Sequence, residues 1–286
     1  MHRLKTLAFL SLLACVAGCA KQQQTASPKD LIAAAWINYS LGEFDQAVIK
    51  LDSALPQTEP SSDLQLQALY GLATTWNLRR PGEDPDLARE LYQKIIATAP
   101  NHDLAAWSQL GLARMIHLVP VGDEPDYDQV LKAYQEVIDK YPRHLAGTEA
   151  FIYKMAILVS SLDEKKTRQA VAEIEEFVKH PENTFIGPAW SLLAVAYTTL
   201  NQPEKRLAAE EESLKTTEVD PTNPFTEFAW QYWNLATIAE FECGDFDTAR
   251  IYYNRLITEY PTDIRVYGAQ QALVRMDGVE KDICGD

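Results

Sequence analysis

The chain has 286 residues, of which 47% are hydrophobic and 23% are charged, so its composition is that of a folded globular protein and excludes a largely disordered one. Its formal net charge is −15, with 41 acidic residues against 26 basic ones. Such an acidic protein is not expected to bind nucleic acid or anionic lipid surfaces. Glycine is scarce, and no β-branched runs alternate with polar residues, so a β-sheet is not expected.

The first 18 residues have the organisation of an export signal. Arg3 and Lys5 form a basic start, and residues 7–16 form an apolar run that is too short for a stable membrane span. The run ends in Val-Ala-Gly followed by Cys19. This order resembles the lipobox of bacterial lipoproteins, in which cleavage precedes the cysteine and the thiol is acylated. The alternative is an ordinary secretory signal with incidental cysteines at positions 15 and 19.

We therefore predict a signal peptide over residues 1–18, and a lipidated Cys19 with a polar tether over residues 19–29. A flexible segment of eight residues spans about 15 Å, which would keep the first helix close to the lipid surface. Ala20 follows the cysteine, where an Asp would resemble an inner-membrane retention signal. The expected location is the bacterial envelope, at the periplasmic face of the outer membrane.

Six prolines recur at nearly equal intervals of 40, 42, 39, 40 and 40 residues: Pro60, Pro100, Pro142, Pro181, Pro221 and Pro261. A period of this size is typical of a solenoid of helix pairs. Proline readily follows a helix end, because it lacks an N–H group and clashes with the preceding turn. Each interval leaves room for two helices of about 15 residues. We predict an all-α, right-handed solenoid of about six helix pairs over residues 30–277.

Two acidic segments account for part of the long period. Residues 81–86 and residues 121–126 both read as turn residues followed by Asp-Pro or Glu-Pro. They are either protruding loops on a functional edge or the starts of the next helices, where a carboxylate and a proline are both favourable.

The segment Lys165-Lys-Thr-Arg168 is the one basic cluster in this acidic chain. It is either a docking site for an acidic partner or a solvated turn between helices. The histidines at 102, 144 and 180 lie beside the repeat-ending prolines, which favours capping or loop roles for them. No metal-binding motif, nucleophile elbow or phosphate-binding loop occurs, so we expect no enzyme activity, no cofactor and no metal site.

Residues 233–261 resemble the tetratricopeptide repeat. The matching residues are Trp233, Gly244, Phe246, Ala249, Tyr253, Leu256 and Pro261, and similar residues recur in phase over residues 30–261. A glycine permits a left-handed turn between helices, and an alanine lets two helices approach. The period of about 40 residues exceeds the 34 of the usual repeat.

The end of the chain reads as one further amphipathic helix over residues 263–276, which caps the solenoid and ends at Gly278. Residues 278–286 are then a tail. After removal of the signal and lipidation of Cys19, the cysteines that remain are Cys243 and Cys284. In an oxidising compartment these two either form a disulfide or remain free thiols.

The tetratricopeptide resemblance implies a concave wall lined by the first helix of each pair. On that alignment the wall contains Trp36, Tyr39, Leu72, Trp76, Leu112, Tyr153, Asn234 and Phe241. A mostly apolar and aromatic wall suits an extended segment or a helix of another protein. The alternative is that Trp36 and Trp76 pack between repeats.

The lipobox, the long repeats and the Tyr-Pro helix ends resemble the BamD-type outer-membrane lipoproteins in layout. This resemblance implies a scaffold in outer-membrane protein assembly, with envelope proteins such as a β-barrel or an assembly complex as partners. The second hypothesis is capture of a glycan or peptide ligand that is passed to a transporter.

Overall fold

The structure of the chain is a computed structural model that describes residues 26–77, 82–217 and 228–284. All regular secondary structure in these ranges is helical, and no strand occurs within them. The prediction of an all-α fold is therefore confirmed. The chain divides into two compact units, residues 1–108 and residues 109–286, which we describe in turn.

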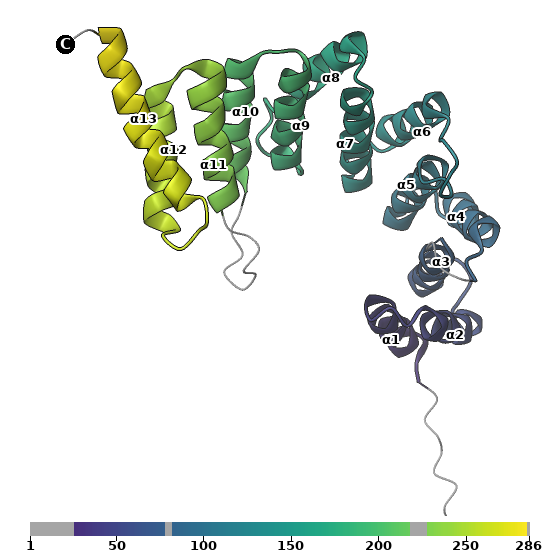
Figure 1. The fold of residues 1–286 in the computed structure, drawn as a ribbon. Helices are drawn as coiled ribbons and strands as arrows, with labels where there is room; N and C mark the ends of the chain where they lie inside the picture. The colour runs from purple at the N-terminus through teal and green to yellow at the C-terminus, as the bar shows by residue number, and fades with distance from the viewer. Residues whose placement is uncertain (1–25, 78–81, 218–227, 285–286) are drawn as a thin grey trace, which may run out of the picture. The chain divides into compact units, whose positions relative to one another are not determined.

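The first unit contains two helix pairs and the start of a third (purple to blue in Figure 1). The pairs are α1 (Pro28–Ser40) with α2 (Phe44–Ala54) and α3 (Asp63–Trp76) with α4 (Pro85–Thr98), and α5 (Asp103–His117) crosses into the second unit. Small residues allow these helices to pack closely, since Ala35, Ala47 and Ala68 are buried in one cluster. A methyl group added to Gly71 of α3 would lie 3.0 Å from the Leu51 side chain of α2, so the glycine allows a close approach of the two helices.

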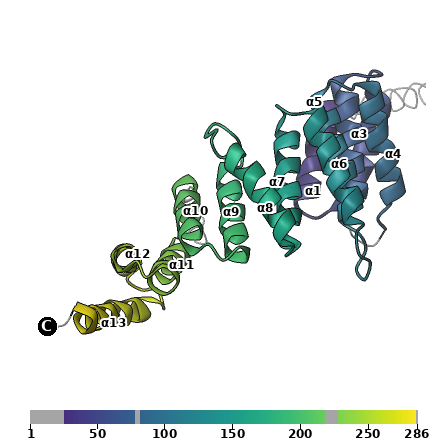
Figure 2. The ribbon, with the colours of Figure 1, turned by 90° about the horizontal axis from the view of Figure 1, so that it is seen from above.

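The second unit continues the same pattern to the end of the chain. Its helices are α6 (Tyr127–Lys140), α7 (Leu145–Ser160), α8 (Glu164–Phe177), α9 (Ile186–Thr199), α10 (Pro203–Thr216), α11 (Ala229–Thr237), α12 (Phe246–Glu259) and α13 (Val266–Cys284). Figures 1 and 2 show α9 beside α10 and α11 beside α12, as expected for successive pairs. Three tyrosines, Tyr134, Tyr232 and Tyr253, are the largest fully buried side chains of the core.

The described helices α1 to α12 form six pairs, and α13 follows as a single helix. This confirms the predicted solenoid of six pairs with a terminal helix. Within the described ranges, no helix has the length and apolar character needed to cross a membrane.

The turn between paired helices has the same backbone conformation in four repeats. Gly42, Leu162, Asn201 and Gly244 stand at equivalent places and have φ values of +78°, +56°, +52° and +67°. The glycines adopt this conformation without strain, whereas Leu162 has a Cβ atom that disfavours it. The repeat is therefore preserved in backbone geometry even where its glycine is missing.

The two acidic segments lead into helices. The Asp84 side chain accepts a hydrogen bond from the Leu87 backbone N–H, and Pro85 is the first residue of α4. This supports the helix-start interpretation for residues 81–86, of which residue 81 lies outside the described ranges. In the second segment α6 starts at Tyr127, and Asp126 is its cap, so the interpretation that Glu-Pro starts the helix is wrong by two residues.

The terminal helix is longer than predicted. α13 runs through Gly278 to Cys284, so Gly278 does not end it and the expected tail from residue 278 is wrong. Gly278 does not have a positive φ, and no atom beyond its own turn of the helix lies within 4 Å of where its Cβ atom would be. The helix therefore continues through this residue. Ala269, Ala272 and Met276 bury the inner face of α13 against the preceding pair.

Candidate functional site

A row of aromatic side chains connects the first unit's helices. Trp36 of α1 lies 5.4 Å from Tyr39 and 6.5 Å from Tyr70 of α3, measured between ring centroids. Tyr70 in turn lies 6.0 Å from Tyr92 of α4. Trp36 remains 36% exposed, and the neighbouring Ile37 is 61% exposed. These residues present an apolar aromatic surface, which we call the N-terminal aromatic surface, formed by Trp36, Ile37, Tyr39 and Tyr70.

The other predicted wall residues of this unit are less exposed. Tyr39 and Trp76 are half-buried and pack against the cluster that contains Leu51. Leu72 is only 3% exposed and belongs to that cluster, so its assignment to the wall is wrong. The reason is its place on α3, where it faces α2. Of the two tryptophans, Trp36 is the one that retains a substantial exposed surface.

In the second unit, Tyr153 of α7 stacks on Tyr134 of α6 at 5.6 Å between centroids. The Arg114 guanidinium lies 5.6 Å from the Tyr153 ring centroid and 4.0 Å from Glu149. Burial raises the pKa of the Tyr153 hydroxyl, so the ring is a neutral phenol at neutral pH. Leu112 of α5 is half-buried.

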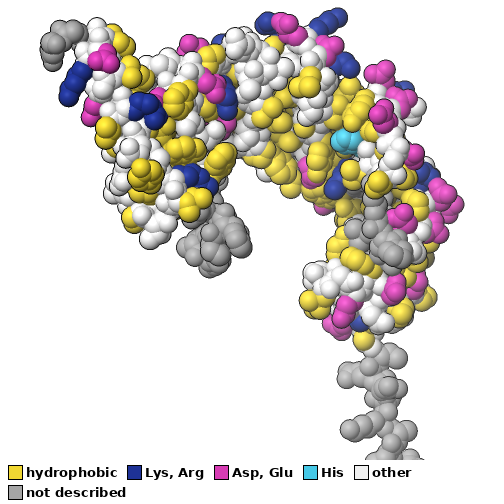
Figure 3. All heavy atoms as spheres, viewed as in Figure 1, with side chains coloured by type: hydrophobic (Ala, Val, Ile, Leu, Met, Phe, Trp, Pro, Cys, Tyr) yellow, Lys and Arg dark blue, Asp and Glu magenta, His cyan; other side chains and the backbone are white. Residues whose placement is uncertain are grey.

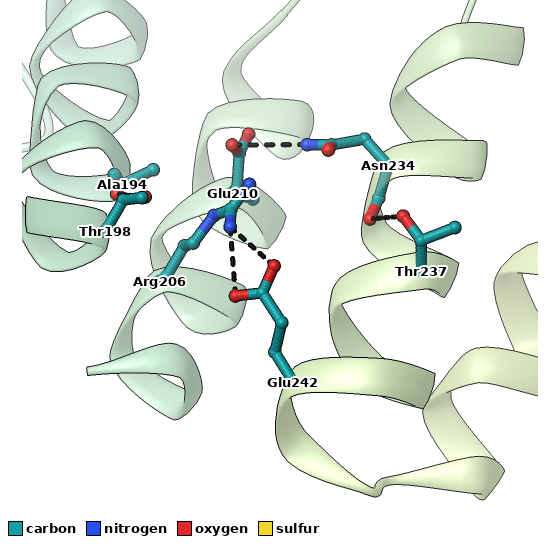
Figure 4. Close-up of polar contacts among 7 residues, drawn as sticks. All are labelled: Ala194, Thr198, Arg206, Glu210, Asn234, Thr237 and Glu242. Atoms are coloured by element: carbon teal, nitrogen blue, oxygen red, sulfur yellow. Dashed lines mark hydrogen bonds and ion pairs between the residues drawn. The ribbon is translucent and has the colours of Figure 1, made fainter. Parts of the chain in front are cut away.

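Asn234 belongs to a polar cluster formed by α10, α11 and residues 238–243 (Figure 4). Its side-chain amide donates to the Glu210 carboxylate at 3.3 Å. One guanidinium nitrogen of Arg206 donates to both oxygens of Glu242, at 2.7 and 3.0 Å. Thr198 and Thr237 bond back to the carbonyl oxygens of their own helices, which occupies both hydroxyl groups. We call Arg206, Glu210, Asn234 and Glu242 the polar cluster.

Burial raises the pKa of Glu210, and the nearby Arg206 and Asn234 partly offset this effect. The Arg206 guanidinium forms hydrogen bonds with Glu242, whereas Glu210 receives a hydrogen bond from Asn234. The polar cluster therefore has one more carboxylate than cations. The four side chains lie on helices of successive pairs. Their surface can accept a hydrogen bond from a donor group or bind a cation.

Phe241 is 66% exposed and lies on a π-helical segment, residues 238–243, that follows α11. The Arg275 guanidinium lies 5.2 Å from its ring centroid. The preceding residue, Glu240, points inward and is buried, and it accepts hydrogen bonds from Tyr253 at 2.8 Å and from Arg275 at 2.6 and 2.8 Å. This buried network fixes the segment that presents Phe241 outward.

The Glu240 network was not predicted from the sequence. Tyr253 was recognised as a repeat position, but its partner Glu240 and the more distant Arg275 carry no local pattern that pairs them. The signal that could have found them is a lone Glu in an otherwise apolar helix face, 35 residues before an Arg in the terminal helix.

Two of the histidines have the predicted capping role. His144 accepts a hydrogen bond from the Ala146 backbone N–H at the start of α7, and His102 does the same for Leu104 at the start of α5. The other ring nitrogen of His102 lies 3.1 Å from Asp63. His180 lies 3.4 Å from Glu182 in the loop before α9.

The basic cluster is not a turn. Lys165, Lys166 and Arg168 lie within the first turns of α8, and Arg168 pairs with Glu164 at 2.6 Å. Lys166 is half-buried, whereas Lys165 is exposed. No group of three or more histidine, cysteine or acidic residues in the described ranges has the geometry to hold a metal ion.

The structure describes only some of the cysteines for which the sequence predicts chemistry. Cys19, the signal peptide and the tether up to residue 25 lie outside the described residues. Cys243 is a half-buried free thiol whose pKa burial raises. Cys284 is the last residue of α13, and its side chain lies outside the described part, so the Cys243–Cys284 disulfide stays a prediction.

Comparisons with known proteins agree with this architecture. Residues 229–263 match the tetratricopeptide repeat family. A solved structure of Pseudomonas aeruginosa pilF superposes with a TM-score of 0.51 at 18% identity, covering 86% of this chain and 97% of that one. A tetratricopeptide repeat protein from Parabacteroides merdae gives a TM-score of 0.48 at 15% identity, covering 89% and 88%. No protein with a curated description matches the sequence.

The first of these similarities supports the fold, and the matched repeat identifies its type. α11 and α12, with the π-helical segment between them, lie within the matched residues. Residues 229–263 are therefore similar to the tetratricopeptide repeat, and the described helices form a helical solenoid of the same kind.

Proposed function

We propose that this chain is a non-catalytic envelope lipoprotein that holds other proteins, with an outer-membrane β-barrel or its assembly complex as the expected partner class. The tetratricopeptide solenoid supports the scaffold role. The lipobox-like segment ending at Cys19 supports the lipid anchor and the outer-membrane location.

The observation that carries the proposal is the N-terminal aromatic surface. Trp36 combines contact with Tyr39 and Tyr70 with an exposed face, so the indole is held in place before any partner arrives. Rigid, partly exposed aromatic groups are the residues that most often dominate binding energy at interfaces. Because α1 follows the tether directly, this surface would lie close to the membrane.

The experiment compares two tryptophan variants. Trp36→Ala should weaken partner binding by about 2 kcal/mol while changing the melting temperature little, because the side chain is partly exposed. Trp76→Ala is the matched control: it removes a half-buried ring from the core cluster and should lower the melting temperature without lowering the affinity of the folded fraction.

Partners are first captured from detergent-solubilised membranes with the lipidated full chain and then titrated with each variant. Unchanged affinity in Trp36→Ala would remove the N-terminal aromatic surface from the proposal. Co-purifying β-barrel machinery would support the assembly role.

The second candidate is capture of a glycan or peptide ligand. Hydrophobic side chains gather over α7 and α9 on the face shown in Figure 3, and aromatic faces stack readily on sugar rings. A saturable glycan-binding signal, with no protein captured from membranes, would favour this reading over the scaffold.

A further inference from the structure

A cavity in the second unit stands apart from the surfaces described above. It has a volume of about 500 Å³ and lies between the end of α5, the start of α6, the end of α7 and the start of α8. Its apolar lining comes from Leu131, Ala156, Ile157 and Leu158. Cavities of about 300 to 1,000 Å³ are the usual size for binding a small organic molecule.

The polar lining of this cavity consists of His117, Tyr127, Ser160, Ser161 and Lys166. No carboxylate is among the lining residues, although the chain as a whole has 41 acidic residues against 26 basic ones. Lys166 is therefore the one charged group of the lining. It belongs to the basic cluster of α8 that the proposed scaffold function does not use, and it lies next to the exposed Lys165.

His117 contributes a second donor. Its Nδ1 atom lies 2.9 Å from the hydroxyl oxygen of Tyr134, a side chain that is only 1% exposed. If Nδ1 donated this bond, the buried hydroxyl proton would have no acceptor, which is costly. We therefore assign the tyrosine as the donor, which leaves the histidine proton on Nε2.

Burial, together with Arg114, lowers the pKa of His117, so its ring is uncharged at neutral pH. Lys166 is then the one charged side chain of the lining, and His117 and Ser160 add neutral hydrogen-bonding groups. Ser161 is already engaged, since its hydroxyl donates to the Leu158 carbonyl oxygen at 2.7 Å.

We propose that this cavity binds a small amphipathic carboxylic acid, with its apolar body against Leu131, Ile157 and Leu158 and its carboxylate paired with Lys166. An ammonium group in the lining is complementary to an anion, and the apolar lining favours burial of a hydrocarbon body. This binding activity is independent of the scaffold function and uses none of its surfaces.

The test uses the full chain carrying Cys19→Ser, which cannot be acylated at that position, so that no detergent competes for the cavity. Sodium octanoate, octylamine and octan-1-ol are titrated by calorimetry at neutral pH. Octanoate should bind with one site per chain, octan-1-ol should bind about tenfold more weakly, and octylamine should not bind.

Two lysine variants form the matched pair. Lys166→Met should weaken octanoate binding about tenfold or more, because it removes the charge-assisted hydrogen bond while it preserves side-chain length. Lys165→Met changes the exposed neighbour and should leave the affinity within about twofold. Thermal melts of both variants confirm that the compared proteins are folded.

Leu131→Trp provides the third arm, because the larger ring would fill the apolar part of the cavity and should abolish binding in protein that melts like the parent. The proposal is overturned if octanoate does not bind at millimolar concentration, if octylamine binds as well as octanoate, or if the two lysine variants change the affinity equally.

Discussion

Leu162 occupies a backbone conformation that residues with a Cβ atom rarely adopt. Its φ of +56° matches that of Gly244 at the equivalent turn of the last repeat, and its side chain is 77% exposed. The exposed leucine gains little from burial to offset the strain, which is of the order of 1–2 kcal/mol. The strain at this turn is a consequence of keeping the repeat geometry with a non-glycine residue.

We expect Leu162→Gly to raise the free energy of unfolding by about 1 kcal/mol, because relief of the left-handed strain exceeds the added entropy of the unfolded chain. Gly244→Ala is the reciprocal variant and should lower it by about 1 kcal/mol, since a Cβ atom there meets no clash but has the disfavoured φ. Urea unfolding of both variants measures the effect. A destabilised Leu162→Gly protein would show that the leucine side chain has a packing role.

Glu210 carries a different energetic cost, which is the burial of its carboxylate. Burial raises its pKa above the ordinary value of 4.5, so the folded protein holds the proton more tightly than the unfolded chain does. The charged form therefore lowers stability, and this penalty is present at neutral pH and disappears as the pH falls below the ordinary value.

Glu210→Gln should accordingly raise the melting temperature at pH 7, and the difference from the parent should shrink as the pH is lowered towards 4. The glutamine oxygen can still accept from the Asn234 amide. Glu204→Gln is the control, because this exposed carboxylate lies in the first turn of α10, where negative charge is favourable. If Glu210→Gln were destabilising at pH 7, the carboxylate would instead be needed for its contacts with Arg206 and Asn234.

At the scale of elements, α13 shows how a helix can carry two glycines for different reasons. A Cβ atom on Gly268 would lie 2.9 Å from the Trp233 ring, so this glycine allows α13 to approach α11. Gly278 has open space around it and no positive φ. The first glycine is required by packing, whereas the second weakens the helix without a structural need.

Gly278→Ala should therefore stabilise the protein by about 0.5–1 kcal/mol, the difference in helix propensity between the two residues. Gly268→Ala in the same helix should destabilise it by about 1–3 kcal/mol, because the ring of Trp233 must move. Chemical denaturation distinguishes the two variants. Equal effects at both positions would contradict the assigned packing role of Gly268.

The number and the pairing of the helices could be predicted from the proline period, because both depend on local signals that recur in every repeat. The end of α13 could not, since Gly278 looks like a helix stop and only its surroundings show that the chain continues as helix. The burial of Leu72 could not be predicted for a related reason. The repeat alignment shows on which face of a helix a residue lies, but not how much of its side chain the neighbouring helix covers.

The candidate site was predictable only in part. Trp36 and Phe241 are exposed, whereas the Asn234 amide donates to the half-buried Glu210 carboxylate. The polar cluster and the buried Glu240 network depend on pairs that are 24 to 36 residues apart. No periodicity in a single sequence links such pairs, so they become visible only in the folded chain.

At the scale of the whole molecule, the acidic charge and the predicted lipid anchor have to be considered together. A net charge of −15 opposes adsorption to an anionic membrane surface, and the described helices contain no membrane span. The lipid anchor proposed at Cys19 would hold such an acidic chain at a membrane without help from its surface charge.

We predict that Cys19→Ser releases the protein from the membrane fraction, because the proposed anchor is acylation of this residue and two or more acyl chains give stable attachment. Cells that express the parent or the variant are fractionated, and the membranes are washed with high salt before the protein is detected. The serine variant should appear in the soluble envelope fraction, whereas the parent should remain with the membranes after the wash. The high-salt wash removes protein that is attached electrostatically. Detergent then extracts the protein that remains with the membranes. A Cys19→Ser protein that stayed wholly in the washed membranes would mean that a partner, and not the lipid, holds this scaffold in place.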